Sequence, residues 1–68
     1  MDFHKATFDT LREAGHVIGV PYMQATRDGG ARLYVPVDGV AMPVEVARLV
    51  ATRRATVAQV AEALSVQP

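Results

Sequence analysis

Residues 16–42, "HVIGVPYMQATRDGGARLYVPVDGVAM", decide the fold of this chain. Two Asp-Gly dipeptides, at 28–29 and 38–39, lie between stretches in which apolar residues recur at alternate positions. Asp-Gly in that setting is the strongest short signal for a β-hairpin, because a tight two-residue turn needs positive φ at both of its residues. The stretch therefore predicts a three-stranded antiparallel meander.

These two turns also predict the register of the strands. If each Asp-Gly pair is the centre of its turn, Tyr22 pairs with Val35 in the first hairpin and Val35 pairs with Met42 in the second. Pro21 then falls opposite Pro36, where neither residue has an N–H to donate, so the ladder should loosen there. Both turns assign the same core face, which supports this register. That face consists of Ile18, Val20, Tyr22, Leu33, Val35, Val37, Val40 and Met42.

The opposite face of the predicted sheet has a mixed character. It carries Met23, Ala25, Arg32, Tyr34 and Ala41, with Met23 directly opposite Tyr34 in this register. Met, Tyr and Arg are residue types that are enriched at protein interfaces. We therefore interpret Met23, Arg32 and Tyr34 as a partner-binding surface. The alternative, that a helix of the same chain covers this face, stays open.

Helices are predicted before and after the meander in the sequence. Residues 3–14 have the apolar periodicity of an amphipathic helix, with Asp2 as its N-terminal cap and Gly15 as its left-handed C-terminal cap. A second helix is expected to start at Pro43, a residue favoured in the first turn. Its apolar arc is wide, so more than one neighbour should cover it.

A third helix is predicted from Thr56, which fits the capping-box pattern together with Gln59. Its buried stripe consists of Val57, Val60, Ala61 and Leu64. The sequence therefore predicts one small α+β domain spanning residues 1–68. Its order is α-β-β-β-α-α, with the three-stranded antiparallel meander packed against helices.

Size and composition limit what the chain can be. It has 68 residues and no cysteine, so disulfides and zinc-thiolate sites are excluded. Natural domains below about 70–80 residues usually gain stability from a metal, a disulfide or a partner subunit. We therefore expect self-association, as a homodimer. Seven basic residues balance seven acidic ones, which disfavours a binder driven by phosphate neutralisation.

The sequence shows no segment typical of export or of a membrane. No apolar run approaches the roughly 20 residues that a membrane span needs. The first ten residues, "MDFHKATFDT", lack the apolar region of a signal peptide. We therefore expect a cytoplasmic protein without membrane association. Ala and Val contribute 11 residues each, and six of the seven basic residues are Arg, a bias typical of GC-rich bacterial or phage genes.

No catalytic or metal-binding motif is present. His4 and His16 have no converging set of Asp, Glu or Cys in the sequence, and the stretch "DGG" at 28–30 belongs to a turn rather than a phosphate loop. We therefore expect no enzymatic activity, no catalytic residue, no metal and no cofactor.

Residues 56–66 resemble the first helix of a bacterial helix-turn-helix motif, through Thr56, the Val60-Ala61 pair and Leu64. The same residues are also what any short buried helix needs, namely a cap and an apolar stripe. No reading helix follows them in the sequence. If this helix itself were the reader, its exposed face would offer phosphate no Arg or Lys.

A small positive corner is formed by Arg48, Arg53 and Arg54. Arginine there could contact phosphate or an acidic partner, or could simply complement the C-terminal dipole of the second helix. The sequence favours a small, non-enzymatic, bacterial or phage-type protein-interaction module that acts as a homodimer on an unidentified protein partner. A dimeric DNA-binding transcriptional regulator is the alternative, and it would use this corner.

Overall fold

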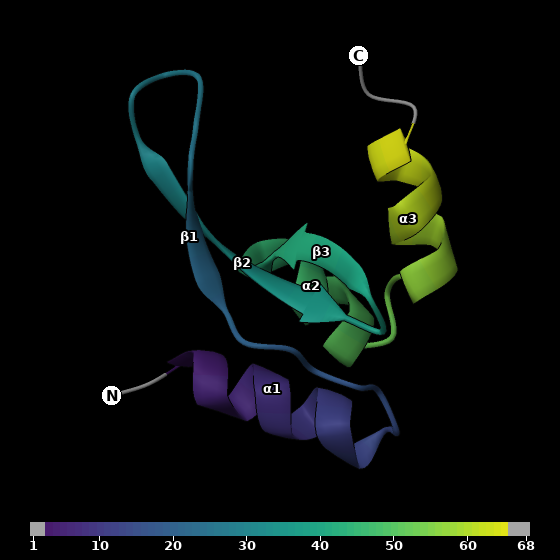
Figure 1. Ribbon diagram of the computed structural model, residues 1–68. Helices are drawn as coiled ribbons and strands as arrows, with labels where there is room; N and C mark the ends of the chain where they lie inside the picture. The colour runs from purple at the N-terminus through teal and green to yellow at the C-terminus, as the bar shows by residue number, and fades with distance from the viewer. Residues whose placement is uncertain (1–2, 66–68) are drawn as a thin grey trace.

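The fold is α+β, with the element order that the sequence predicts. A computed structural model describes residues 3–65 (Figure 1). The elements are α1 (Phe3–Glu13), β1 (Tyr22–Ala25), β2 (Ala31–Val37), β3 (Val40–Pro43), α2 (Val44–Ala51) and α3 (Val57–Ser65). The strands form one antiparallel sheet in the order β1-β2-β3. The predicted cap Asp2 lies outside the described residues.

The core lies between α2 and the paired strands β2 and β3. α2 lies behind these strands in Figure 1 and contacts both of them. α1 packs on α2, and α3 contacts β3, so α2 has neighbours on several sides. The buried apolar residues are Leu11, Val35, Val37, Met42, Val44, Ala47, Val50 and Val60. The wide apolar arc predicted for α2 is explained by this central position.

The second hairpin has the predicted turn and the predicted register. Asp38 and Gly39 have φ values of 51° and 83°, as a two-residue hairpin turn with positive φ at both positions requires. Val37 pairs with Val40, and Val35 pairs with Met42. The alternation that places Val35, Val37 and Met42 in the core is therefore confirmed.

The first hairpin has a longer turn than the sequence suggested. The Thr26 N–H donates to the Gly30 carbonyl at 3.0 Å, and the Gly29 N–H donates to the Thr26 carbonyl at 3.2 Å. Gly29 has a φ of 87°. These features define a three-residue loop, Arg27-Asp28-Gly29, in which a first turn is followed by a left-handed glycine. The Asp28 carboxylate stabilises the loop by accepting hydrogen bonds from the Thr26 hydroxyl and the Gly30 N–H.

The extra loop residue makes the predicted register of the first hairpin wrong by one position. Tyr22 pairs with Tyr34, and Met23 pairs with Leu33. A slip of one residue moves every side chain of a strand to the other face. Tyr22 therefore leaves the core face on which we expected it and is 40% exposed, and Met23 does not lie opposite Tyr34. Val20, also expected in the core, is 84% exposed.

A bulge precedes β1 and replaces the expected pairing of Pro21 with Pro36. Ile18 bridges to Val37, so three residues, 19–21, lie opposite two residues of β2. The Gly19 N–H donates to the Pro36 carbonyl at 2.9 Å. A Cβ atom at Gly19 would lie 2.9 Å from Cγ of Pro36, so this close approach needs glycine.

Asp38 joins the turn between β2 and β3 to the segment that follows α1. Its Oδ1 accepts from the Val17 N–H at 2.8 Å, and its Oδ2 lies 2.7 Å from Nδ1 of His16. The Asp38 N–H donates to the Val17 carbonyl at 2.8 Å. The hydrogen bonds from the His16 side chain and from the Val17 N–H hold the pKa of Asp38 below its ordinary value of 3.8.

We expect Asp38→Asn to lower the melting temperature near neutral pH. Because the folded pKa of Asp38 is depressed, its carboxylate stabilises the fold above pH 3.8, and this stabilisation is lost as the pH falls through the lower folded value. Asn tolerates positive φ, so the substitution tests the charge rather than the turn. Calorimetry across pH should show the difference between the two melting temperatures shrinking as the pH falls below 3.8 and Asp38 of the folded wild type becomes protonated. A difference that stays constant with pH would contradict this account.

Candidate protein-interaction surface

The exposed apolar side chains of this protein concentrate on one segment. Among the described residues, the large hydrophobic residues that are exposed are Val17 (72%), Val20 (84%), Tyr22 (40%), Met23 (62%) and Leu49 (42%). Four of these five lie between residues 17 and 23. Tyr22 and Met23 lie on β1, which Figure 1 shows extending away from α2, and Val17 and Val20 lie in the segment between α1 and β1. This part of the chain therefore carries most of the large apolar side chains that the fold of the monomer leaves exposed.

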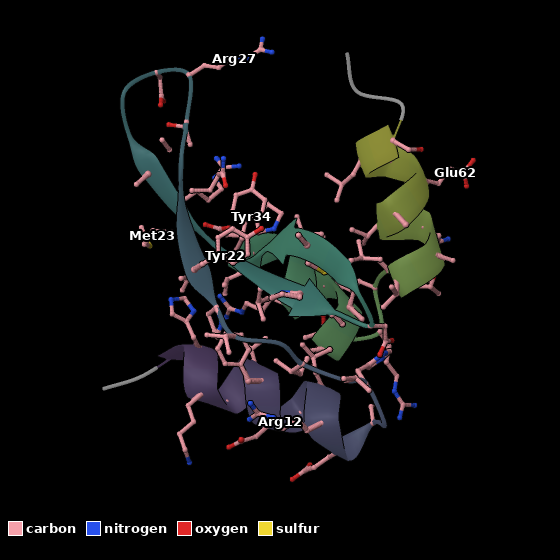
Figure 2. The ribbon with its side chains drawn as sticks, in the orientation of Figure 1. Arg12, Tyr22, Met23, Arg27, Tyr34 and Glu62 are labelled. Carbon is pink, nitrogen blue, oxygen red and sulfur yellow. The ribbon has the colours of Figure 1, made fainter. Side chains whose placement is uncertain are left out.

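The outer face of the hairpin carries an aromatic pair. Tyr22 and Tyr34 are cross-strand partners, with ring centroids 6.0 Å apart and planes inclined by 22°. The neighbouring pair on this face is Gln24 with Arg32. Figure 2 shows the two rings side by side. We call these four residues the tyrosine face, and no described helix lies in front of it in Figure 1.

Two of the three predicted partner-binding residues lie on the tyrosine face. Arg32 and Tyr34 are both there, and Arg32 is exposed. Met23 lies on the other face of the hairpin beside Leu33, although it is largely exposed as well. The hypothesis of one surface containing all three residues is therefore wrong in its geometry. No helix of residues 3–65 covers the tyrosine face, so the alternative of a third layer does not hold for them.

Tyr22 belongs to this face although the sequence pattern assigns it to the core. The signal that could have found it is the spacing "TRDG" at 26–29, since a type I turn followed by left-handed glycine is the next most common hairpin connection after the two-residue turn. That connection pairs Tyr22 with Tyr34. The error therefore lies in the length chosen for one loop.

The predicted positive corner follows the end of α2. Arg48 lies in the last turn of the helix, and Arg53 has a φ of 61°. The Arg54 N–H donates to the Leu49 carbonyl at 2.8 Å, and the Arg53 N–H donates to the Val50 carbonyl at 3.1 Å. These two bonds form a Schellman motif, with Arg53 in the position that usually belongs to glycine. All three arginines are exposed.

The start of α3 has the predicted capping box. The Thr56 N–H donates to Oε1 of Gln59 at 2.9 Å, and the Gln59 N–H donates to Oγ1 of Thr56 at 3.1 Å. The amide of Gln59 is therefore engaged within its own helix. The other exposed residues of the face that could read DNA are Ala58, Glu62 and Ala63. Their side chains are two methyl groups and one carboxylate, and none of these binds phosphate.

An open apolar groove of about 230 Å³ lies between α2 and α3. Its lining consists of Val46, Leu49, Ala55, Gln59, Val60, Ala63 and Leu64. Val60 is the one residue of α3 among the buried core residues of the described chain. Most of the apolar stripe of α3 is therefore only partly covered.

The polar residues within 3–65 form no cluster of three His, Cys, Asp or Glu side chains that could hold a metal. His16 is engaged with Asp38, and the ring of His4 stacks on Phe8 at 6.4 Å. No helix within the same span is long and apolar enough to cross a membrane. No protein-family model matches the chain, and comparisons with curated proteins and with solved structures find no match. A functional proposal therefore depends on the surface chemistry of the chain itself.

We expect Arg53→Gly to stabilise the domain. A left-handed conformation costs a residue with a Cβ roughly 1–2 kcal/mol, and the greater freedom of glycine in the unfolded chain offsets part of that gain. A net gain of about 1 kcal/mol would raise the melting temperature by about 4–8 °C in a domain of this size. Arg54→Gly is the matched control, because it removes the same charge where φ is not positive, and it should not stabilise. Equal effects of the two substitutions would contradict the role of backbone strain.

Proposed function

We propose that this protein is a small, non-enzymatic protein-binding module of bacterial or phage type, and that the tyrosine face is its contact surface. The observation that carries the proposal is the stacked pair of Tyr22 and Tyr34 beside exposed Arg32, on a face of the sheet that no described helix covers. Protein–protein contact gives such residues the burial that the fold of the monomer does not provide.

The chemistry of the tyrosine face suits a protein partner. Tyr22 and Tyr34 present large, rigid rings whose hydroxyl groups can bond to a partner, and their stacking fixes the rings before binding. Little side-chain entropy is then lost on association. Arg32 adds a planar group that binds carboxylates in a bidentate manner. Tyr and Arg are two of the residue types that dominate binding energy at interfaces.

The charges of the hairpin indicate what the partner should offer. Arg27 lies at the tip of the hairpin, and Arg32 lies next to the tyrosine pair (Figure 2). The carboxylate of Asp28 is held inside the loop, where hydrogen bonds from the Thr26 side chain and the Gly30 N–H lower its pKa. Both cations lie on the tip side of the aromatic pair, so the complementary surface is an apolar patch with Asp or Glu at the edge that meets the hairpin tip.

The geometry of α3 favours protein over DNA as the partner. Gln59 is engaged in the capping box, and Glu62 is exposed where a reading helix would meet phosphate. The net charge of zero supplies no general attraction to a polyanion. The arginine corner at Arg48, Arg53 and Arg54 is the part of the surface through which DNA would have to act.

Site-specific photo-crosslinking tests this proposal. A photo-reactive amino acid at Ala41, which is exposed on the same face of the sheet as Tyr34, should give discrete adducts in a bacterial lysate. The matched position is Glu13, which is exposed on α1, and it should not give them. Excess unlabelled wild-type protein should compete the adducts away. Tyr34→Glu should lose the competition and Tyr34→Phe should retain most of it, because only the first introduces a charge.

Two results would overturn the proposal. Adducts that form equally at both positions, or that Tyr34→Glu competes as well as wild type, would show that the tyrosine face is not the contact surface. In a separate NMR titration with mixed-sequence duplex DNA at low salt, amide shifts at Arg48, Arg53 and Arg54 that vanish as salt rises would identify a DNA-binding protein.

A further inference from the structure

We propose that two copies of this chain pair through the free edge of β1. The pairing is antiparallel, with its two-fold axis at Gln24, and it joins the two sheets into one sheet of six strands. The proposal goes beyond the function proposed above, because it uses the backbone edge of the hairpin, and Gln24 is the one residue of the tyrosine face that it involves. It follows from the hydrogen-bond pattern of β1, from the charges of the segment around it and from the chemistry of Gln24.

The backbone groups of Met23 and Ala25 point away from the sheet. β1 is an edge strand, since β2 is its only neighbour in the sheet order. In an antiparallel ladder, alternate residues of an edge strand bond to the neighbour and the others point outward. The Thr26 N–H bonds to the Gly30 carbonyl, so the even-numbered residues Tyr22 and Gln24 bond to β2. The odd-numbered residues therefore present their N–H and C=O groups to the free edge.

This edge lacks the charged residues that usually protect a strand edge. Residues 17–26 contain no Asp, Glu, Lys or Arg, although charged residues make up 21% of the chain. Exposed edges are normally blocked by such charges, by proline or by very short strands, since an open edge pairs with any available strand. Pro21 lies just before β1 and has no N–H to donate, so it limits pairing to the strand itself.

The open edge determines the register of the pair. With the axis at Gln24, Met23 of one copy lies opposite Ala25 of the other, and both residues point outward. Each such pair exchanges two hydrogen bonds, and the symmetry doubles them, so the backbone of the short strand forms about four new bonds. With the axis at Met23, Pro21 would lie opposite Ala25, and one donor would be missing.

The side chains of this register fit a second copy better than an unrelated strand. A two-fold axis brings identical residues together, so charged residues near it would repel, and β1 has none. Gln24 of one copy lies opposite Gln24 of the other, at a position where the two strands approach closely. An amide carries both donors and an acceptor, so two Gln24 side chains are complementary to each other. Met23 is 62% exposed in the single chain, and in the pair it lies opposite Ala25 of the second copy.

Charge placed on the edge should dissociate this dimer. We expect wild-type protein at submillimolar concentration to sediment at twice the 7.3 kDa mass of one chain, and Met23→Lys and Ala25→Lys to sediment at 7.3 kDa. Both positions are exposed in one copy, so lysine there is compatible with the fold of the monomer. Ala58→Lys is the control, because it adds the same charge on the exposed side of α3, and it should remain a dimer.

Hydrogen exchange gives a second measurement that does not depend on a variant. The Met23 and Ala25 amides should exchange slowly at high protein concentration and quickly on dilution, whereas the Gln24 amide, bonded to β2, should change less. Wild-type protein that stays monomeric up to millimolar concentration would overturn the proposal. So would a dimer that survives Met23→Lys and dissociates with Leu49→Glu, because that dimer would use the α2–α3 groove.

The two proposals can fail independently. Tyr34→Glu changes the face of the hairpin, so it should abolish competition for the partner and leave the sedimentation mass unchanged. Edge variants that lose the dimer but still compete against the crosslinking of the partner at Ala41 would leave the proposed function intact. If the wild-type protein is a dimer but excess unlabelled protein does not reduce its crosslinks, the edge proposal stands and the proposed function is wrong.

Discussion

The hydrogen bond from the Thr26 N–H to the Gly30 carbonyl is the constraint on which the surface of this protein depends. It closes a loop of three residues instead of two, and Gly29 adopts the left-handed conformation that this loop needs. Since strand side chains alternate between faces, the length of this loop decides whether the even-numbered or the odd-numbered residues of β1 lie on the open face of the sheet. Tyr22 consequently pairs with Tyr34 rather than with Val35, and an aromatic pair forms on the open face of the sheet.

The two Asp-Gly dipeptides show why the same local signal gives two different turns. Asp38 adopts positive φ, and its carboxylate bonds to His16 and Val17, which come from a distant part of the chain. Asp28 does not have positive φ, and its carboxylate bonds to Thr26 and Gly30 within its own loop. The tight turn at Asp38 is thus supported by a tertiary contact, whereas the loop at Asp28 follows from local hydrogen bonds.

The helices, the second hairpin and the core could be predicted because each depends on local periodicity. Val35, Val37 and Met42 alternate towards α2, and the capping box of Thr56 and Gln59 needs only four consecutive residues. The candidate surface could be predicted only in part, because it depends on register. Arg32 and Tyr34 belong to β2, whose faces the second hairpin fixes correctly, and both lie on the open face. Met23 belongs to β1, so the loop error assigned it to the wrong face.

The open face and the open edge have a common origin in how the apolar residues are distributed. α2 covers β2 and β3, and the buried side chains come from these elements and from the helices around them. β1 contributes no residue to the buried core of the described chain, yet it and the segment before it carry Val20, Tyr22 and Met23. A strand that contributes nothing to the core is free of the packing constraints that fix β2, so burial within the monomer does not explain its apolar residues. Its edge and its face point in perpendicular directions, so one copy and one partner can bind the same hairpin at the same time. In the six-stranded arrangement the tyrosine faces of both copies lie on one side of a continuous sheet, and a partner with two matching sites would then bind through both faces at once.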